Sequence, residues 1–247
     1  MITIKSHSEL ELMRKAGKIV AGTFETLKRY IKPGITTKEL DQIAYDYIRS
    51  NGATPSFLNY SGYPASICTS INDCVIHGIP GDTKLCDADI ISIDIGACYK
   101  GYHGDSAKTF AVGNISADAK RLIDVTRQSF YEGIKFAKRK NRIGDISSAI
   151  GEYIESNGFG VVRDYTGHGI GKNLHEDPSV LNFGRAGHGP RLMAGMTVAI
   201  EPMVTAGDYE VYVEDDDWTV MTQDGSLSAH YEHTILITDG ECEILTL

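Results

Sequence analysis

Hydrophobic residues recur at helical spacing near the start of the chain and predict two successive helices. Ser8 and Glu11 fit a capping box for the first helix, which Lys32-Pro33-Gly34 ends. Thr36 and Glu39 fit a second capping box, for a helix that stops at Asn51-Gly52. The apolar positions of the two helices are Leu12, Ala16, Ile19, Val20, Phe24 and Leu27, then Leu40, Ile43, Ala44, Tyr47 and Ile48.

A similar pair of helices is predicted later, one over about 117–140 and one ending at Asn157-Gly158. The sequence DYIRSNG at 46–52 matches EYIESNG at 152–158, an offset of 152 − 46 = 106. The apolar segment LCDADIISID at 85–94 matches LMAGMTVAIE at 192–201, an offset of 107, and each ends in a carboxylate. Two matches at nearly one offset predict duplicated halves, unless similar element patterns merely look alike.

The halves are not separated by a linker rich in proline, glycine or serine. Residues 1–247 are therefore predicted to form one α/β (α+β) domain with two lobes. The repeats would span about 8–112 and 116–247.

The segments 90–95 and 102–112 predict two strands of a hairpin joined by the two-residue turn Lys100-Gly101. That turn pairs residues whose numbers add up to 201. Gly96 then lies opposite Asp105, and Asp94 lies one step further along the same face.

Asp94 and Asp105 are thus expected to be diagonal neighbours, with Gly96 leaving an open space between them. Two carboxylates in an apolar strand repel each other, so one stays protonated or a cation lies between them. The alternative is a pair of solvated carboxylates on an exposed face.

The second half carries matching carboxylates. Glu201 ends its segment at the position of Asp94. A later hairpin is predicted to turn at Asp224-Gly225 and to lead into a strand that carries Glu232, the expected counterpart of Asp105. If the halves pack about a pseudo-twofold axis, the four carboxylates converge and can hold two divalent ions, with at least one carboxylate bridging them.

Histidines supply further candidates. Glycines flank His168 in TGHGIG, which favours a metal ligand over the commoner structural role. His77 and His175 lie beside glycine or proline loops and are candidates for proton transfer or for binding an oxyanion. We interpret the others as surface residues, His7 and His188, or as structural residues, His103, His230 and His233.

Composition narrows the class of protein. The net charge of −9 gives no general affinity for nucleic acid. The basic segment 135–142 fits either a solvated helix end or a docking patch for RNA or a ribosome. No membrane span or secretory signal is found, which predicts a cytoplasmic protein. Five cysteines without a CxxC motif argue against a disulfide framework and a zinc ribbon.

Five segments together resemble the type 1 methionine aminopeptidases over essentially the whole chain. They are IHGIPGD (76–82), ISIDIGACYKGYHGDSA (91–107), TGHGIGKNLHEDP (166–178), GMTVAIEPM (195–203) and YEHTI (231–235). No single segment would suffice, whereas their order and combination are highly specific. The resemblance implies the pita-bread fold, with two pseudo-twofold-related halves of antiparallel sheet, helices packed outside, and a dinuclear metal site.

By position, the resemblance implies that Asp94 binds one ion. Asp105 and Glu232 would bridge both ions, and His168 and Glu201 would complete the other. Four carboxylates and one imidazole suit Mn²⁺, Fe²⁺, Co²⁺ or Zn²⁺.

The implied activity is hydrolytic removal of the N-terminal methionine, with preference for a small second residue. A hydroxide bridging two divalent ions would attack the methionine carbonyl. Glu201 would also carry the proton, His175 would bind the carbonyl oxygen, and His77 would contact the scissile amide nitrogen.

The resemblance also implies a pocket for the methionine side chain. It would be lined by Phe57, Tyr60, Tyr63, Cys68, Leu174 and Trp218. Phe57 stands where the family usually has cysteine, and Leu174 where it usually has phenylalanine, so the two changes are expected to compensate in volume. Ser61 replaces a histidine common in the family.

Partners follow from the same resemblance. The family implies peptide and nascent-protein N-termini as substrates, transient ribosome contact and a monomer. It implies no membrane and no specific nucleic acid partner.

Two other functions remain open. A prolidase or X-Pro peptidase of the same fold would share the five ligands but normally carries a large extra N-terminal domain, whereas here the first helix starts near residue 9. A non-catalytic binding protein of this fold would typically lose metal ligands. A plain structural domain does not explain why acids end two matched apolar strands.

Overall fold

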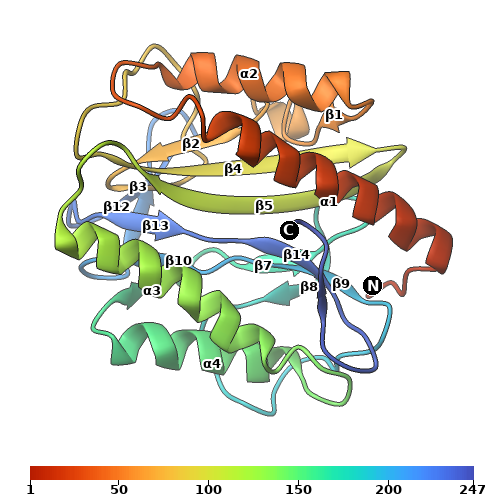
Figure 1. Ribbon diagram of the computed structural model, residues 1–247. Helices are drawn as coiled ribbons and strands as arrows, with labels where there is room; N and C mark the ends of the chain where they lie inside the picture. The colour runs from red at the N-terminus through yellow and green to blue at the C-terminus, as the bar shows by residue number, and fades with distance from the viewer.

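Four α-helices pack on small antiparallel sheets in the computed structural model, which describes all 247 residues (Figure 1). The helices are α1 (His7–Leu27), α2 (Thr37–Ser50), α3 (Ala117–Ile134) and α4 (Ile143–Ser156), with one 3₁₀ turn, η1 (Tyr60–Gly62). Helix α1 packs on two strands of the first sheet and against α2, and α3 packs against α4. No helix combines the length and the apolar character needed to cross a bilayer.

The strands form four sheets. The first contains β1 (Thr54–Pro55), β2 (Cys68–Ile71), β4 (Ile90–Tyr99) and β5 (Tyr102–Ala111). The second contains β6 (Gly160–Val161), β10 (Met203–Thr205) and β13 (Ser228–His230). The third contains β3 (Cys74–Ile76), β11 (Val211–Val213) and β12 (Val220–Thr222). The fourth contains β7 (Gly167–Gly169), β8 (Glu176–Val180), β9 (Thr197–Ile200), β14 (His233–Leu236) and β15 (Glu243–Ile244).

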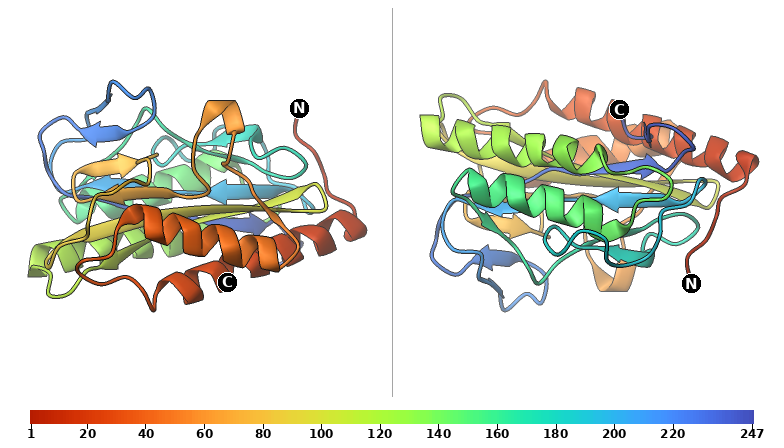
Figure 2. Two further views of the ribbon diagram at one scale, coloured as in Figure 1. Left: turned by 90° about the horizontal axis from the view of Figure 1, so that it is seen from above. Right: turned by 90° about the horizontal axis from the view of Figure 1, so that it is seen from below.

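Two hydrophobic cores lie between helices and strands. One joins α1 and α2 to β4, and the other joins α3 and α4 to β9, β10, β13 and β14. A smaller cluster joins Met13 of α1 to side chains such as Phe57 and Leu174. Figure 2 shows the helices mainly toward one face, with η1, β11 and β12 projecting from the other.

The predicted hairpin of β4 and β5 is confirmed. Lys100 and Gly101 form its turn with φ angles of 49° and 83°, as a two-residue turn with two left-handed residues requires. Gly96 pairs with Asp105 and Asp94 pairs with Ala107. The register places both acids on one face of the sheet, as predicted.

A backbone seam joins β5 to the segment between β13 and β14. Ala107 and Glu232 exchange both backbone hydrogen bonds, at 3.3 and 2.8 Å. On either side, the Thr109 hydroxyl bridges the backbone of His230, and the Thr234 hydroxyl bridges that of Asp105. This pairing places Glu232 directly beside Ala107 of β5, and its equivalence with Asp105 in the two halves stays a prediction. The duplication of the chain itself stays a prediction.

Two helix boundaries differ from the prediction. Helix α1 is capped by Ser6 with Glu9, not by Ser8 with Glu11, because Ser6 has the extended backbone that a capping residue needs. Helix α3 ends at Ile134 rather than near Lys140. After Ile134 the chain turns, and the amides of Phe136 and Ala137 each donate to the carbonyl three residues earlier. Ala137 is buried in the core before α4 begins.

The hairpin predicted at Asp224-Gly225 does not form as a strand pair. The turn exists, but β12 pairs with β11 and β3, whereas β13 pairs with β10. The Thr222 amide bonds to the Asp73 carbonyl and the Ser228 amide to the Asn72 carbonyl, which draws the two strands into different sheets.

Candidate active site

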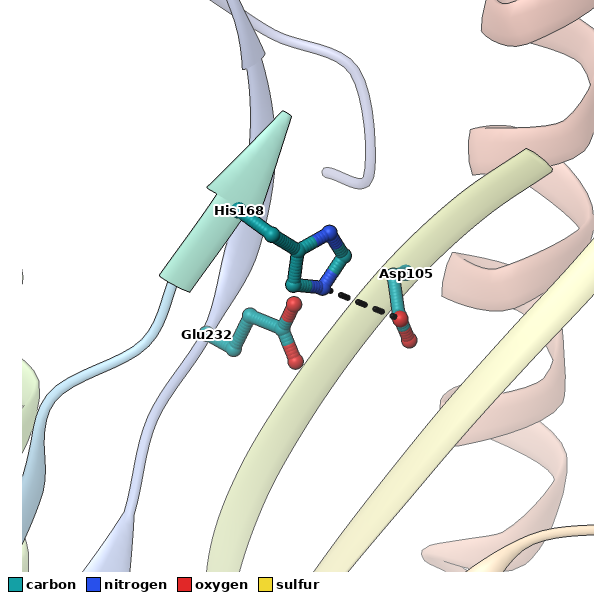
Figure 3. Close-up of side chains that lie close together, drawn as sticks. All are labelled: Asp105, His168 and Glu232. Carbon is teal, nitrogen blue, oxygen red and sulfur yellow. Dashed lines mark ion pairs between the residues drawn. The ribbon is translucent and has the colours of Figure 1, made fainter. Parts of the chain in front are cut away.

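Three side chains from segments far apart in the sequence meet in one place. Asp105 comes from β5, His168 from β7, and Glu232 from the junction of β13 and β14 (Figure 3). One ligand atom from each lies within 4.8 Å of the other two, and all three residues are buried. Glu201, which directly follows β9, places Oε1 at 3.6 Å from His168 Nε2, while Asp105 Oδ2 lies at 3.9 Å.

The imidazole of His168 turns a lone pair toward these carboxylates. Its Nδ1 donates to the Gly169 carbonyl oxygen at 2.9 Å, since a carbonyl can only accept. Burial lowers the pKa of His168 to about 3, so the ring is neutral at pH 7 and Nε2 carries no proton. A lone pair facing carboxylate oxygens requires a proton or a cation between them, and a backbone bond at the other ring nitrogen is typical of metal-ligating histidines.

The carboxyl groups are also in an electrostatically unfavourable environment. Burial first, and neighbouring carboxylates second, hold the pKa values of Asp105, Glu201 and Glu232 well above the usual range. Burial also raises the pKa of Asp94 to about 7. One buried oxygen each of Asp94, Asp105 and Glu232 has no hydrogen-bond partner. No lysine or arginine pairs with these acids, so the donor set fits divalent cations.

A row of paired residues across neighbouring strands sets the spacing between Asp94 and Glu232. Cys68 pairs with Asp94, Asp94 pairs with Ala107, and Ala107 pairs with Glu232. These side chains share one face, and the methyl group of Ala107 leaves room between the two acids. Gly96 does not leave the open space that the sequence predicted. A Cβ there would lie 2.7 Å from the Phe57 ring and from the Ser56 side chain, so Phe57 fills that space.

All the predicted site residues line one cavity. Besides the five predicted ligands, its lining contains Phe57, Tyr60, Tyr63, Cys68, His77, Leu174, His175 and Trp218. Phe57, Tyr63, Cys68 and Leu174 are buried, and the rings of Tyr63 and Trp218 meet edge to face at 5.1 Å. A cavity that combines apolar side chains with a few convergent charged groups is typical of a small-ligand site.

Both predicted non-ligand histidines reach this cavity. The Tyr60 hydroxyl lies 2.7 Å from His175 Nδ1, and the His175 ring lies 4.2 Å from that of His168. His77 packs edge to face on Tyr165 and Trp218, and burial lowers its pKa to about 4.

Sequence reasoning missed the place of His230. It was interpreted as structural, yet its buried Nε2 has no partner and lies 3.9 Å from Glu201 Oε2. Its position two residues before Glu232 was an available signal, because alternate residues of a strand share a face. His103 and His233 make internal hydrogen bonds, and His7 and His188 are exposed, as predicted.

A family model described as metallopeptidase family M24 matches residues 11–239. The chain belongs to metallopeptidase family M24. A methionine aminopeptidase of Clostridium perfringens is 57% identical over 100% of this chain and 99% of its own length.

Solved structures agree with this assignment. The crystal structure of methionine aminopeptidase from Rickettsia prowazekii superposes with a TM-score of 0.99 at 44% identity and covers both chains completely. A prolidase from Pyrococcus furiosus has a TM-score of 0.80 at 23% identity, over 99% of this chain and 65% of the prolidase, and shows the fold alone. This M24 metallopeptidase therefore has the pita-bread fold that the sequence predicted.

We expect Asp94→Ala and Glu232→Ala each to weaken metal binding and to abolish peptide hydrolysis, because each removes one of the carboxylates that would hold the cations. Mn²⁺ retained per chain after dialysis is the direct measurement. Asp118→Ala, at an exposed acid in the first turn of α3, is the control and should retain metal normally. Full activity and normal metal content in either site variant would contradict the assignment.

Proposed function

We propose that this M24 metallopeptidase removes the N-terminal methionine from peptides and proteins, with preference for a small second residue. One observation carries the proposal: a single cavity joins the carboxylate–imidazole cluster to an apolar wall that suits an unbranched thioether. The full-length relative of the same name, at 57% identity, supports the same substrate.

Two divalent ions would be held by the five predicted ligands. Asp94 would bind one ion, Asp105 and Glu232 both, and His168 and Glu201 the other, with the partnerless carboxylate oxygens as donors. When bound, the ions would lower the pKa of a water held between them and offset negative charge on the substrate carbonyl. Mn²⁺, Fe²⁺, Co²⁺ and Zn²⁺ all suit this donor set.

The remaining side chains would orient the substrate and move protons. When the Tyr60 hydroxyl donates to His175 Nδ1, the other ring nitrogen carries the proton and can donate to the methionine carbonyl oxygen. His77 is neutral at pH 7 and would contact the scissile amide nitrogen. Glu201, whose Oε1 lies 3.6 Å from His168 Nε2 in the ligand cluster, would take up the proton that the attacking water loses.

Partners and location complete the proposal. Substrates would be the N-termini of peptides and nascent chains, met by a monomer in the cytoplasm. Ribosome contact would use residues 135–142, but Lys135 pairs with Glu132 and Arg139 with Asp239. These ion pairs favour the alternative interpretation of that segment as a solvated helix end.

Release of free methionine from Met-Ala-Ser and Met-Lys-Ser peptides tests the activity. Metal-depleted protein should be inactive, and added Mn²⁺ or Co²⁺ should restore cleavage of Met-Ala-Ser while Met-Lys-Ser is spared. An Ala-Pro peptide serves as the control for a prolidase-type enzyme and should not be cleaved. Cleavage of Ala-Pro alone, or of nothing with any metal, would contradict the proposal.

Phe57 and Leu174 belong to one buried cluster and line the cavity together. Phe57→Cys with Leu174→Phe should therefore change the preference among Met, Leu and norleucine peptides less than either single substitution does, since volume is restored across a shared pocket. The measurement is kcat/KM for each peptide. Strict additivity of the two single effects would argue against a shared wall.

A further inference from the structure

A buried ion pair lies at the end of the loop 171–176, which carries His175. Lys5 Nζ is 2.6 Å from Glu176 Oε2, and the two side chains are only 5% and 8% exposed. In every other pair that a lysine, an arginine or the N-terminus forms, both side chains are at least 26% exposed. Burial of two charges is costly, and an apolar pair of similar volume often stabilises a protein equally well. Stability alone therefore does not explain this pair.

The Glu176 carboxylate closes the loop 171–176 on itself. Its Oε1 accepts from the Asn173 amide at 3.2 Å, and its Oε2 also accepts from the Thr3 hydroxyl at 2.7 Å. The Gly171 amide donates to the Asn173 carbonyl at 3.1 Å, which tightens the same turn. Between these anchors the chain presents Leu174 and His175 to the cavity.

The N-terminal segment is fitted against this loop. The Lys5 amide donates to the Gly195 carbonyl at 2.9 Å, so the segment is fixed to the loop before β9. At Gly171 a Cβ would lie 2.5 Å from Lys5 Cε and 2.7 Å from Glu176 Oε1. A larger residue at this position would displace the ends of both side chains. Glu176 itself is not among the residues that line the cavity.

We propose that Lys5 and Glu176 are positioning residues that hold His175 in register with the substrate carbonyl. This inference rests on the role proposed above for His175. The His175 ring is otherwise held by Tyr60, which is itself 39% exposed, so the backbone of the loop must supply the rigidity. Displacement of a catalytic group by about 1 Å can cost up to about 10²-fold in rate. The ion pair of Lys5 and Glu176, which we call the brace, therefore has a functional reason.

The paired variant Lys5→Met/Glu176→Met tests the proposal, because it removes both charges together and leaves no unpaired buried ion. With Mn²⁺-loaded enzyme and Met-Ala-Ser, kcat should fall about 10-fold or more while KM and bound metal stay nearly constant. Amide hydrogen exchange should become faster within residues 170–178 only. The matched control is Arg14→Met/Glu243→Met, at an ion pair outside the cavity, which should change neither readout.

The same paired substitution in a His175→Ala enzyme separates positioning from a general structural effect. If the brace acts through His175, the pair should lower kcat by less than about 2-fold in that background. An equal loss in both backgrounds, or no loss in the wild-type background, overturns the brace. If His175→Ala alone leaves kcat unchanged, the proposed role of His175 fails instead. Should the paired variant not fold, Glu176→Gln is measured in both backgrounds with the same criteria.

Discussion

The structure depends on the electrostatic repulsion within one buried cluster of acids. Asp94, Asp105, Glu201 and Glu232 surround an imidazole whose free nitrogen carries a lone pair rather than a proton. No lysine or arginine pairs with them. A fold that buries such a cluster must either protonate the acids or bind cations, and a neutral imidazole with a free lone pair can serve as a metal ligand. Cations bound by these acids, in place of protons, distinguish a metallopeptidase from a structural domain of the same fold.

The fold brings the cluster together through strand register rather than through flexible loops. Ala107 lies between Asp94 and Glu232, and on either side of it the hydroxyls of Thr109 and Thr234 join β5 to β13 and β14. Ligands on strands are held more precisely than ligands on loops. Glu201 and Glu232 lie directly at strand ends, as do His77 and His175, whereas Tyr60 lies in the 3₁₀ turn η1 and contacts His175.

The sequence predicted the β4–β5 register because strand alternation is strict and the turn at Lys100-Gly101 leaves one pairing. It could not predict that Phe57 fills the space at Gly96, because that contact joins segments with no shared periodicity. It also could not predict the separation of β12 from β13, which depends on long-range hydrogen bonds to Asn72 and Asp73. Strand alternation indicates that His230 shares a face with Glu232, but its sequence context has no flanking glycine or other mark of a site residue, and it lies beside Glu201.

Calorimetric titration of metal-depleted protein with Mn²⁺ near pH 7, in two buffers of different ionisation enthalpy, tests the central claim most directly. Because burial raises the pKa of Asp94 to about 7 and holds those of the other three acids well above their usual range, the cation-free site retains protons that binding must displace. Two ions should bind per chain, with net release of at least one proton. Binding of fewer than two ions, or binding with no proton release, would contradict this expectation.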